Sequence, residues 1–326
     1  MNSLDRTPVH IITGFLGAGK TTFLNHFIKE HLPGRIMVIE NECGDTNIDG
    51  GLVINGVEEV IELSAGCLCC SLADGLLDVL AEAAKRRDQY DRLVIETTGI
   101  ADPSSILQVF LEDPRVEQVF ELAQVICLAD ARLLEEWLEE AEEALRQLAL
   151  ADVILVNKTD TVSPVYIPKI KSLVENINPH ASVFTGAQGI FPVADIMKTS
   201  TTTPRSIENA HSHDHDDHDH GTNRHKITTF TLTFQHPLDL DHLSLDLNRI
   251  VKLYRHQVYR VKGIIEIPRY PNRVVLQSAR SAFIATDGAP WQEGEIREGK
   301  LVFIGRELKR KVFEKMFNRH IVEMNE

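Results

Sequence analysis

Three features are scarce or missing in this sequence: long apolar runs, an apolar leader and excess positive charge. No stretch is apolar over the length that spans a bilayer, since even VFELAQVICLA is interrupted by Glu121 and Gln124. The first ten residues, MNSLDRTPVH, contain no apolar signal core. We therefore expect a cytoplasmic protein that has no membrane partner.

The missing positive charge bears on the class of partner. The formal net charge is -14, with 34 Lys and Arg against 48 Asp and Glu. A protein that binds nucleic acid, or docks on anionic lipid, needs a basic face that neutralises phosphates. The charge therefore argues against both partners and favours a role in solubility. Much of the acidity lies in residues 134–148, which we expect to form one helix with a solvated face.

Cysteine is also scarce, and its distribution is uneven. Only five of 326 residues are cysteine, yet Cys67, Cys69 and Cys70 stand within four consecutive positions. Thiols stay reduced in the cytoplasm, and adjacent cysteines are poorly placed for a relaxed disulfide with each other. The cluster therefore predicts metal or redox chemistry. Cys127, alone in an apolar strand, is expected to be a small buried hydrophobic residue.

The first two thirds of the chain alternates short apolar runs with amphipathic stretches. This pattern predicts an α/β fold with a mostly parallel sheet covered by helices on both faces. Strands are expected at 9–13, 35–40, 60–63, 92–97, 124–130, 152–157 and 182–185. Helices are expected at 20–31, 72–87, 103–113, 134–148 and 164–178.

The composition changes after residue 198, so we divide the chain into domains at 1–198 and 226–326. Residues 199–225 are polar without a hydrophobic period and are expected to be a flexible linker rich in His and Asp. The last region predicts a smaller α+β domain with mostly antiparallel strands. Its strands are expected at 228–234, 258–267, 273–280 and 301–308, and its helices at 241–256 and 310–320.

A phosphate-binding loop connects the first expected strand to the first expected helix. The stretch GFLGAGKTT, residues 14–22, matches the P-loop motif G-x-x-x-x-G-K-[ST] in the strand–loop–helix context that the motif requires. The parallel sheet is therefore expected to be of the P-loop NTPase type. Its backbone N–H groups and the helix N-terminus favour bound phosphate. Lys20 is expected to reach the β- and γ-phosphates, and Thr21 to ligate Mg²⁺. The nucleotide contacts predicted here are Gly14, Gly17, Ala18, Gly19, Lys20, Thr21 and Thr22.

Two later strand ends add base and γ-phosphate contacts. The strand end NKTD supplies Asn157, Lys158 and Asp160. The Asp160 carboxylate would accept hydrogen bonds from N1–H and the 2-amino group of guanine, which adenine does not offer. We expect Lys158 to lay its stem against the base with its ammonium near the P-loop. Residues 185–189, TGAQG, are a weaker candidate for contacting the base by backbone.

The strand end ETTG carries the remaining predicted catalytic residue. Glu96 is expected to help hold Mg²⁺ or to position water, and Gly99 to approach a γ-phosphate through its N–H. The alternative is ordinary polarity at the end of a strand. Lys20 and Thr21 complete the predicted catalytic set.

The thiol cluster suits zinc, because thiolates are soft ligands. Its C-x-C-C spacing supplies at most three ligands from one short turn, so the fourth position is left for water, a client or another segment. Residues 39–45, IENECGD, supply Glu40, Glu42, Cys43 and Asp45 as candidates. A site with one replaceable ligand fits a metal that is handed on. Cys43 fits a ligand and a buried residue equally well.

A histidine run in the expected linker adds weak metal ligands. Imidazole and carboxylate side chains together bind Zn²⁺, Ni²⁺ or Co²⁺ multivalently, so we interpret the run as a metal-gathering arm within a solvated linker. Its histidines are His211, His213, His215, His218 and His220.

These motifs together resemble the CobW-like GTPases, a metallochaperone family related to the hydrogenase- and urease-maturation GTPases. The matching segments, in order along nearly the whole chain, are 14–22, 41–44, 66–70, 96–99, 157–160, the His-rich linker and 300–308. The resemblance implies slow GTP hydrolysis, a metal site at the C-x-C-C cysteines with Glu40 and Asp45 as further ligands, and a C-terminal domain that engages clients. Cys43 stands where relatives usually carry an aromatic residue, and Asp45 where Glu is common.

The resulting hypothesis is a GTP- and Mg²⁺-dependent chaperone that delivers Zn²⁺, or else Co²⁺ or Ni²⁺, to a client protein or cofactor pathway, as a monomer or homodimer. GTP would order residues 40–50 and the C-x-C-C turn, and hydrolysis would relax them and release the metal. One rival is a zinc buffer or sensor with a regulatory nucleotide site. Another is a P-loop kinase or ATPase with a structural metal, which Asp160 argues against.

Overall fold

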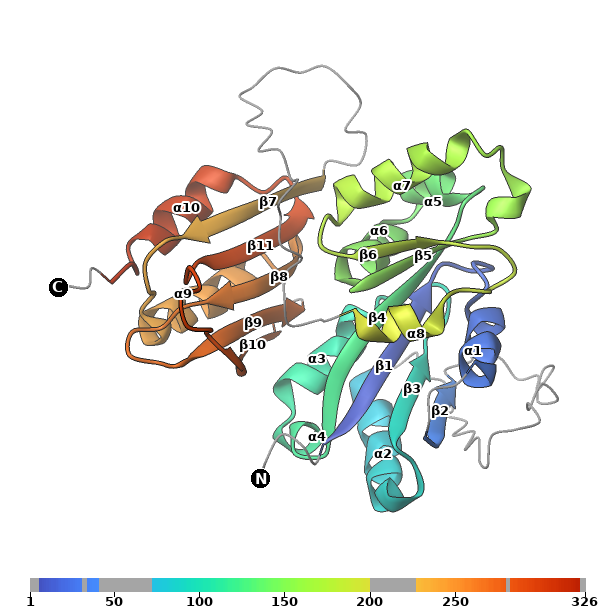
Figure 1. Ribbon diagram of the computed structural model, residues 1–326, viewed down its shortest axis with the longest axis horizontal. Helices are drawn as coiled ribbons and strands as arrows, with labels where there is room; N and C mark the ends of the chain where they lie inside the picture. Colours follow the sequence, from blue (N-terminus) through green and yellow to red (C-terminus); the bar gives the residue numbers. More distant parts are fainter. Residues whose placement is uncertain (1–5, 31–33, 41–71, 200–226, 280–281, 323–326) are drawn as a thin grey trace. The chain divides into compact units, whose positions relative to one another are not determined.

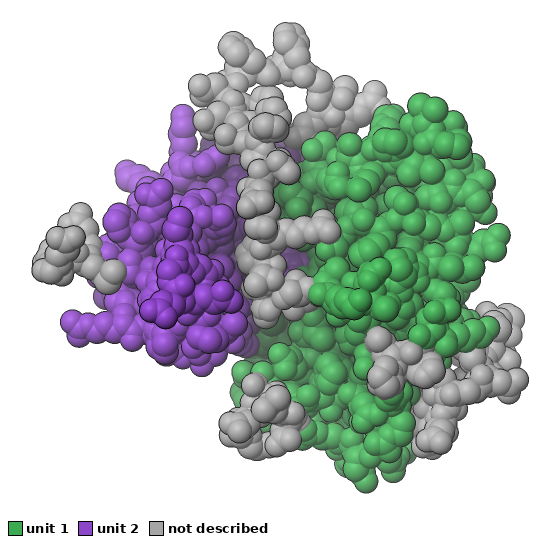
Figure 2. Space-filling model, viewed as in Figure 1, with its two compact units in different colours: residues 1–199 green, residues 200–326 purple. Residues whose placement is uncertain are grey.

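A computed structural model describes residues 6–30, 34–40, 72–199, 227–279 and 282–322. The chain forms two compact units, residues 1–199 and 200–326, which Figure 2 shows in green and purple. Most of the predicted linker and the predicted strand at 60–63 lie outside the described residues, and the predicted domain boundaries stay a prediction. Among the described helices, none combines the length and the apolar character needed to cross a membrane.

Unit 1 is built on a six-stranded sheet in the order β2-β3-β1-β4-β5-β6, in which every neighbouring pair is parallel. This confirms the predicted parallel sheet (Figure 1). The strands are β1 (Thr7–Gly14), β2 (Ile36–Glu40), β3 (Arg92–Glu96), β4 (Phe120–Asp130), β5 (Val153–Asn157) and β6 (Ser182–Thr185).

Helices cover both faces of this sheet. Adjacent residues of β1 point to opposite faces, and both Ile11 and Ile12 are fully buried. The helices are α1 (Lys20–Lys29), α2 (Leu72–Lys85), α3 (Ser104–Glu112), α4 (Pro114–Glu117), α5 (Leu134–Glu140), α6 (Glu142–Leu150), α7 (Tyr166–Ile177) and α8 (Val193–Lys198). The described residues of the unit also contain two single 3₁₀ turns, η2 (Arg87–Gln89) and η3 (Thr159–Thr161).

The acidic run does not form the single helix that we predicted. Ala141 adopts an extended conformation, with φ -130° and ψ 115°, and separates α5 from α6. The interruption lets each short helix bury its own apolar side chains. Trp137 of α5 packs its ring 4.9 Å from that of Phe15, while Leu145 and Leu148 of α6 are buried.

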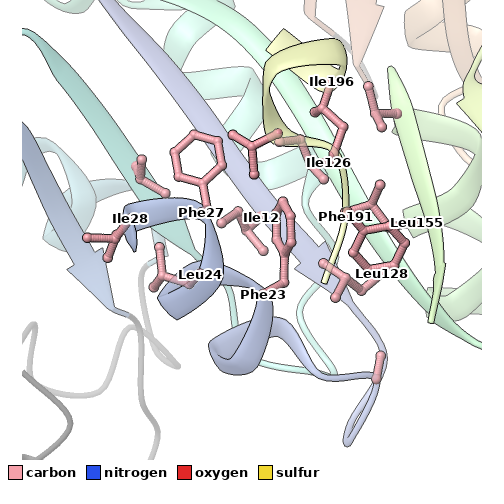
Figure 3. Packing of buried hydrophobic residues seen from close by; sticks show 14 of the residues in the cluster. Ile12, Phe23, Leu24, Phe27, Ile28, Ile126, Leu128, Leu155, Phe191 and Ile196 are labelled. Carbon is pink, nitrogen blue, oxygen red and sulfur yellow. The ribbon is translucent and has the colours of Figure 1, made fainter. Parts of the chain in front are cut away.

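One face of the sheet is packed by α1 and by the segment that ends in α8 (Figure 3). Phe23 and Phe27 of α1 are buried against each other, and the Phe191 ring meets that of Phe23 edge-on at 5.8 Å. Strand residues such as Ile12 and Ile126 form the floor of this cluster. Because α1 is fixed by its buried aromatic side chains, the loop that joins it to β1 is held at both ends.

Unit 2 is an antiparallel sheet with helices, as predicted for the second domain. Its strand order is β10-β9-β8-β11-β7, and all neighbouring pairs are antiparallel. The elements are β7 (Ile227–Phe234), α9 (Leu240–Leu253), β8 (Val258–Ile265), β9 (Asn272–Ala279), β10 (Ala282–Pro290), β11 (Gly299–Arg306) and α10 (Arg310–Asn318). Strand β10 was not predicted. Both helices pack into one apolar cluster with the sheet, around Phe303, Phe313 and Phe317.

Candidate functional site

The predicted nucleotide contacts meet at one edge of the sheet of unit 1. Strands β1, β3, β4 and β5 are parallel neighbours, so their carboxyl ends lie at the same edge. The P-loop, residues 14–22, leaves β1 at this edge and runs directly into α1, which begins at Lys20. Segments that are far apart in sequence therefore surround one loop, as nucleotide binding requires.

Two glycines of the P-loop are required by close backbone approaches. Gly14 has φ +142°, and a Cβ there would lie 2.3 Å from the carbonyl oxygen of Leu128 on β4. Gly19 has φ +98°, and a Cβ there would lie 2.4 Å from Nδ2 of Asn157. A larger residue at either position would push the loop away from the sheet edge.

Lys20 lies inside the curve of the P-loop. Its ammonium donates hydrogen bonds to the carbonyl oxygens of Gly14 at 3.1 Å and Phe15 at 3.4 Å. The side chain is 8% exposed, and burial lowers its pKa from the ordinary lysine value. A cation in this position gains stabilisation from an incoming anion, so the geometry fits a phosphate ligand.

Thr21 and Glu96 are brought together across 75 positions of sequence. The Thr21 hydroxyl donates a 2.8 Å hydrogen bond to Oε1 of Glu96, which ends β3. Hard oxygen ligands of this kind suit Mg²⁺, and a hydroxyl next to a carboxylate at the first turn of α1 fits the predicted Mg²⁺ position. At the same end of the sheet, the Thr97 hydroxyl donates a 3.1 Å hydrogen bond to the hydroxyl of Thr13 on β1.

Asn157 links the P-loop to residues 185–189. Its Nδ2 donates to the carbonyl of Ala18 at 2.9 Å, and its Oδ1 accepts from the N–H of Gly189 at 3.0 Å. The N–H and the hydroxyl of Thr159 both donate to the carbonyl of Gly186. The structure thus places Asn157 in the framework of the site, between two loops predicted to contact nucleotide.

Lys158 and Asp160 follow Asn157 at the rim of the site. Lys158 has φ 59°, in the left-handed region, and its ammonium lies 2.8 Å from Oδ2 of Asp130 at the end of β4. Asp160 is exposed on the 3₁₀ turn, where a ligand can reach its carboxylate. The Lys158 ammonium thus has a fully buried carboxylate as its ion-pair partner, and its predicted place near the P-loop stays a prediction.

Asp130 was missed by sequence reasoning, although a signal for it existed. It ends an apolar strand with an acidic residue, as Glu96 does, and the same argument applied to residues 124–130 would have found it. Its other carboxylate oxygen accepts from the N–H of Arg132 at 2.9 Å. The residue therefore holds Lys158 from a rigid strand end.

Gly99 lies directly on the P-loop. A Cβ at Gly99 would be 2.6 Å from both the nitrogen and the Cα of Leu16. Its carbonyl oxygen accepts a 3.1 Å hydrogen bond from Nε2 of Gln147 on α6. Gly99 therefore contacts the P-loop, and the predicted approach of its N–H to a γ-phosphate stays a prediction. Gln147 had no sequence signal.

The predicted metal ligands lie almost wholly outside the described residues. Apart from the Mg²⁺ candidates Thr21 and Glu96, only Glu40 is described, by its backbone: it ends β2 and pairs in register with Glu96 of β3. Within the described ranges, no three His, Cys, Asp or Glu side chains gather as a metal site. The residues outside are Glu42, Cys43, Asp45, Cys67, Cys69, Cys70, His211, His213, His215, His218 and His220.

Cys127 is the described cysteine, and the prediction of a buried hydrophobic role is confirmed. Its side chain is 2% exposed on β4, and burial raises the pKa of the thiol to about 12. A thiol held protonated in this way is a poor metal ligand.

Comparison with known families agrees with this geometry. The family model for the CobW/HypB/UreG nucleotide-binding domain matches residues 8–185, more than half of the chain. The chain belongs to the CobW/HypB/UreG family. The model for the cobalamin synthesis protein cobW C-terminal domain matches residues 227–321, so both units of this CobW-type protein have a counterpart.

Curated relatives extend over the whole chain. The zinc chaperone YjiA of Escherichia coli K12 is 33% identical over 304 residues, covering 92% of this chain and 94% of the relative. The zinc chaperone CobW of Pseudomonas aeruginosa is 29% identical and covers 94% of this chain and 90% of the relative. The crystal structure of the Zn(II)-bound YjiA GTPase from E. coli superposes with a TM-score of 0.69 at 30% identity, covering 99% of this chain and all of that one.

Proposed function

We propose that this CobW-family protein binds GTP with Mg²⁺ at the sheet edge of unit 1, hydrolyses it slowly, and uses the cycle to carry a transition metal to a client. The observation that carries the nucleotide part is the pairing of Thr21 with Glu96 beside the buried Lys20 ammonium. These three groups would face the β- and γ-phosphates and their cation. Mg²⁺, when bound, offsets the charge of the phosphate oxygens.

Guanine specificity is assigned to the rim formed by Lys158 and Asp160. Asp160 is exposed and acceptor-only when ionised, so it matches N1–H and the 2-amino group of guanine. Asp130 fixes the end of the Lys158 side chain, which leaves the methylene stem as a surface against which a flat base can lie. Asn157 keeps this rim at a constant distance from the phosphate loop.

Zinc is the proposed cargo, with Co²⁺ and Ni²⁺ as alternatives. Zinc is supported by two relatives that are known as zinc chaperones, YjiA of E. coli and CobW of P. aeruginosa. The soft thiolates of Cys67, Cys69 and Cys70 would bind it, with Glu40 and Asp45 as further ligands and the histidine arm as a collecting segment. The client would be a metalloprotein or an enzyme of a metal-cofactor pathway.

The register of β2 and β3 supports coupling between the two sites. Glu40, where the proposed metal-ligand segment begins, is the neighbour of Glu96, which holds Thr21. A displacement at Glu96 that follows loss of the γ-phosphate would reach Glu40 through one strand pair. Because coupling of binding free energies is reciprocal, bound metal should also change the affinity for GTP.

The test is a titration of Zn²⁺ and Co²⁺ into the full-length protein with excess Mg²⁺ and either GDP or a non-hydrolysable GTP analogue. We expect the affinity for one of the two metals to be higher with the GTP analogue than with GDP, and the Cys69→Ala variant to lose that gain. Cys127→Ala is the matched control, because it removes a buried thiol on β4 and should keep the gain.

Two results would contradict the proposal. Equal metal affinity with both nucleotides would make the protein a buffer or sensor with a separate nucleotide site. Preference for ATP over GTP in the same binding assay would remove the assigned role of Asp160 and favour a P-loop kinase or ATPase.

A further inference from the structure

The loop that follows β3 is anchored from the opposite side by a helix that sequence reasoning did not connect with the site. Nε2 of Gln147 on α6 donates to the carbonyl of Gly99 at 3.1 Å and to that of Ala101 at 3.0 Å. The Gln147 side chain is 1% exposed. A buried amide that satisfies two loop carbonyls at once restricts the orientation of both peptide groups.

Other contacts complete the anchoring of residues 97–102. The N–H of Ala101 donates to the carbonyl of Thr98 at 3.1 Å, which closes a turn around Gly99. Arg146, next to Gln147 on α6, donates from Nη1 to Oδ2 of Asp102 at 2.8 Å. The Arg146 and Asp102 side chains are 21% and 13% exposed, so this ion pair is partly shielded from solvent.

The anchored turn lies in contact with the P-loop. The approach of Gly99 to the backbone of Leu16 leaves no room for a side chain between them. The separation of the two loops is therefore set on one side by Gly99 itself and on the other by the length of the Gln147 side chain. The Thr97 N–H, bound to the carbonyl of Ile12 at 2.9 Å, fixes the start of the loop.

We infer that Gln147, supported by Arg146, is a positioning residue that holds the Gly99 turn in the place where it discriminates a nucleoside triphosphate from a diphosphate. This inference rests on the proposed function, in which the N–H of Gly99 faces a γ-phosphate. A diphosphate ends before the turn, so only the triphosphate depends on where the turn lies. The turn is preformed by α6, which makes it a fixed sensor.

The experiment measures dissociation constants of GDP and of a non-hydrolysable GTP analogue, with Mg²⁺, for the wild-type protein and two matched variants. Gln147→Met removes the two hydrogen bonds and keeps the side-chain length. Asn178→Met is the control, because Asn178 is equally buried and donates to carbonyls of α6 at Leu148 and of Ala151, away from the turn.

For Gln147→Met we expect affinity for the GTP analogue to fall about tenfold while GDP affinity is unchanged, because a released turn would occupy the triphosphate-binding position only about a tenth of the time and the apparent affinity falls with that fraction. Asn178→Met should lower the unfolding temperature without changing the ratio of the two dissociation constants. The steady-state kcat should fall for Gln147→Met only.

A partly exposed residue gives the same test without disturbing the core. Arg146→Met should lower the ratio of triphosphate to diphosphate affinity in the same direction, about threefold, since it loses the shielded ion pair with Asp102, together with a more exposed one to Glu142 on its own helix. Equal weakening of both nucleotides by Gln147→Met, or an unchanged ratio in both variants, would overturn the inference while leaving the proposed function intact. Absence of guanine-nucleotide binding in the wild-type protein would instead overturn the proposed function.

Discussion

The two units use their buried polar residues in different ways. In unit 1 five of the described buried polar residues gather where β1, β3, β4 and β5 end, and they contact loops, while others such as His10 and Gln124 lie inside strands. The five are Thr13, Glu96, Thr97, Asp130 and Asn157. In unit 2 the buried polar residues are spread over the fold and several bind within it. Ser278 accepts from the N–H of Val261 at 2.8 Å, and Asp246 binds His320 at 2.7 Å.

The difference follows from strand direction. Neighbouring parallel strands all end at one edge, so a polar residue at each strand end becomes a neighbour of the others. In an antiparallel sheet successive strands end at opposite edges, so the same pattern would divide such residues between two places. Unit 1 therefore collects a site from distant motifs, whereas unit 2 offers a compact apolar core with two helices on it.

The units also differ in charge. Residues 227–321 contain 16 Lys and Arg and ten Asp and Glu, although acidic residues exceed basic ones in the whole chain. The net charge of -14 therefore arises outside this region. The net charge of the whole chain thus does not represent unit 2, and the exclusion of nucleic acid and lipid as partners stays a prediction.

The largest expected difference between the units is a loss of stability confined to unit 2, caused by a substitution in its apolar core. Phe303 is fully buried between Phe313 and Phe317, so Phe303→Ala should cost about 3–5 kcal/mol of unfolding free energy in unit 2. The two tryptophans report on the units separately, because Trp137 is in unit 1 and Trp291 in unit 2. Denaturant unfolding of single-tryptophan variants should show the loss at Trp291 alone.

Nucleotide affinity provides the control for this substitution. It should be unchanged in Phe303→Ala, as in Val312→Ala on the exposed side of α10. A parallel loss of nucleotide binding would mean that unit 2 contributes to the site, and the comparison would fail.

The reverse test removes the phosphate-binding cation. Lys20→Ala should weaken GTP and GDP by about a hundredfold, because a charge-assisted hydrogen bond to phosphate contributes up to about 3 kcal/mol. Lys169→Ala is the control, since that side chain is 63% exposed on α7. Fluorescence titration with a labelled guanine nucleotide measures both. Retained affinity in Lys20→Ala would place the nucleotide elsewhere.

Acid should weaken unit 1 before unit 2. His10 is 4% exposed, its Nδ1 has no hydrogen-bond partner among the described residues, and burial lowers its pKa to about 4. Between pH 6.5 and 4 the unfolded chain binds the proton and the folded unit does not, so stability falls as pH falls. The loss is about 2–3 kcal/mol between pH 6.5 and 4.5, at about 1.4 kcal/mol per pH unit.

Unit 2 has the opposite trend at His242. Its hydrogen bond to Asp239 raises the His242 pKa. The stabilisation of the folded unit by protonated His242 is therefore present below pH 6.5 and is lost as the pH rises through the raised pKa. Unfolding followed at Trp137 should thus become easier with acid, and His10→Leu should flatten that dependence. An equal acid response at Trp291 in the same variants would contradict the assignment to His10.

The smallest expected change concerns base selectivity. Asp160→Asn replaces an acceptor-only carboxylate with an amide that donates, so it should lower the preference for GTP over ATP by about 10- to 100-fold. Asp195→Asn, an exposed carboxylate on α8, is the control. Competition binding with unlabelled nucleotides measures the preference. An unchanged preference would assign guanine recognition to residues 185–189 instead.

Elements of strongly periodic sequence were predictable, and elements defined by their partners were not. The P-loop and the six described strands of unit 1 followed from apolar runs and glycine spacing, which are local signals. Strand β10 contains Gly288 and Pro290, which disfavour strand, and it forms because Ala282–Asp287 pair with β9. The interruption at Ala141 was likewise not predictable from the neighbouring residues. It separates α5 from α6, and each of these helices buries its own apolar side chains.

By itself the sequence determined the phosphate-binding loop, the strand ends at Glu96 and Asn157 with Asp160 three residues later, and the division into an α/β and an α+β part. These depend on neighbours within a few positions, whose backbone preferences are written in consecutive residues. Only the tertiary structure decided that Asp130 holds Lys158 and that Gln147 holds the Gly99 turn. A buried amide or carboxylate obtains its partner from whichever strand or helix the fold brings beside it, and no spacing along the chain records that choice.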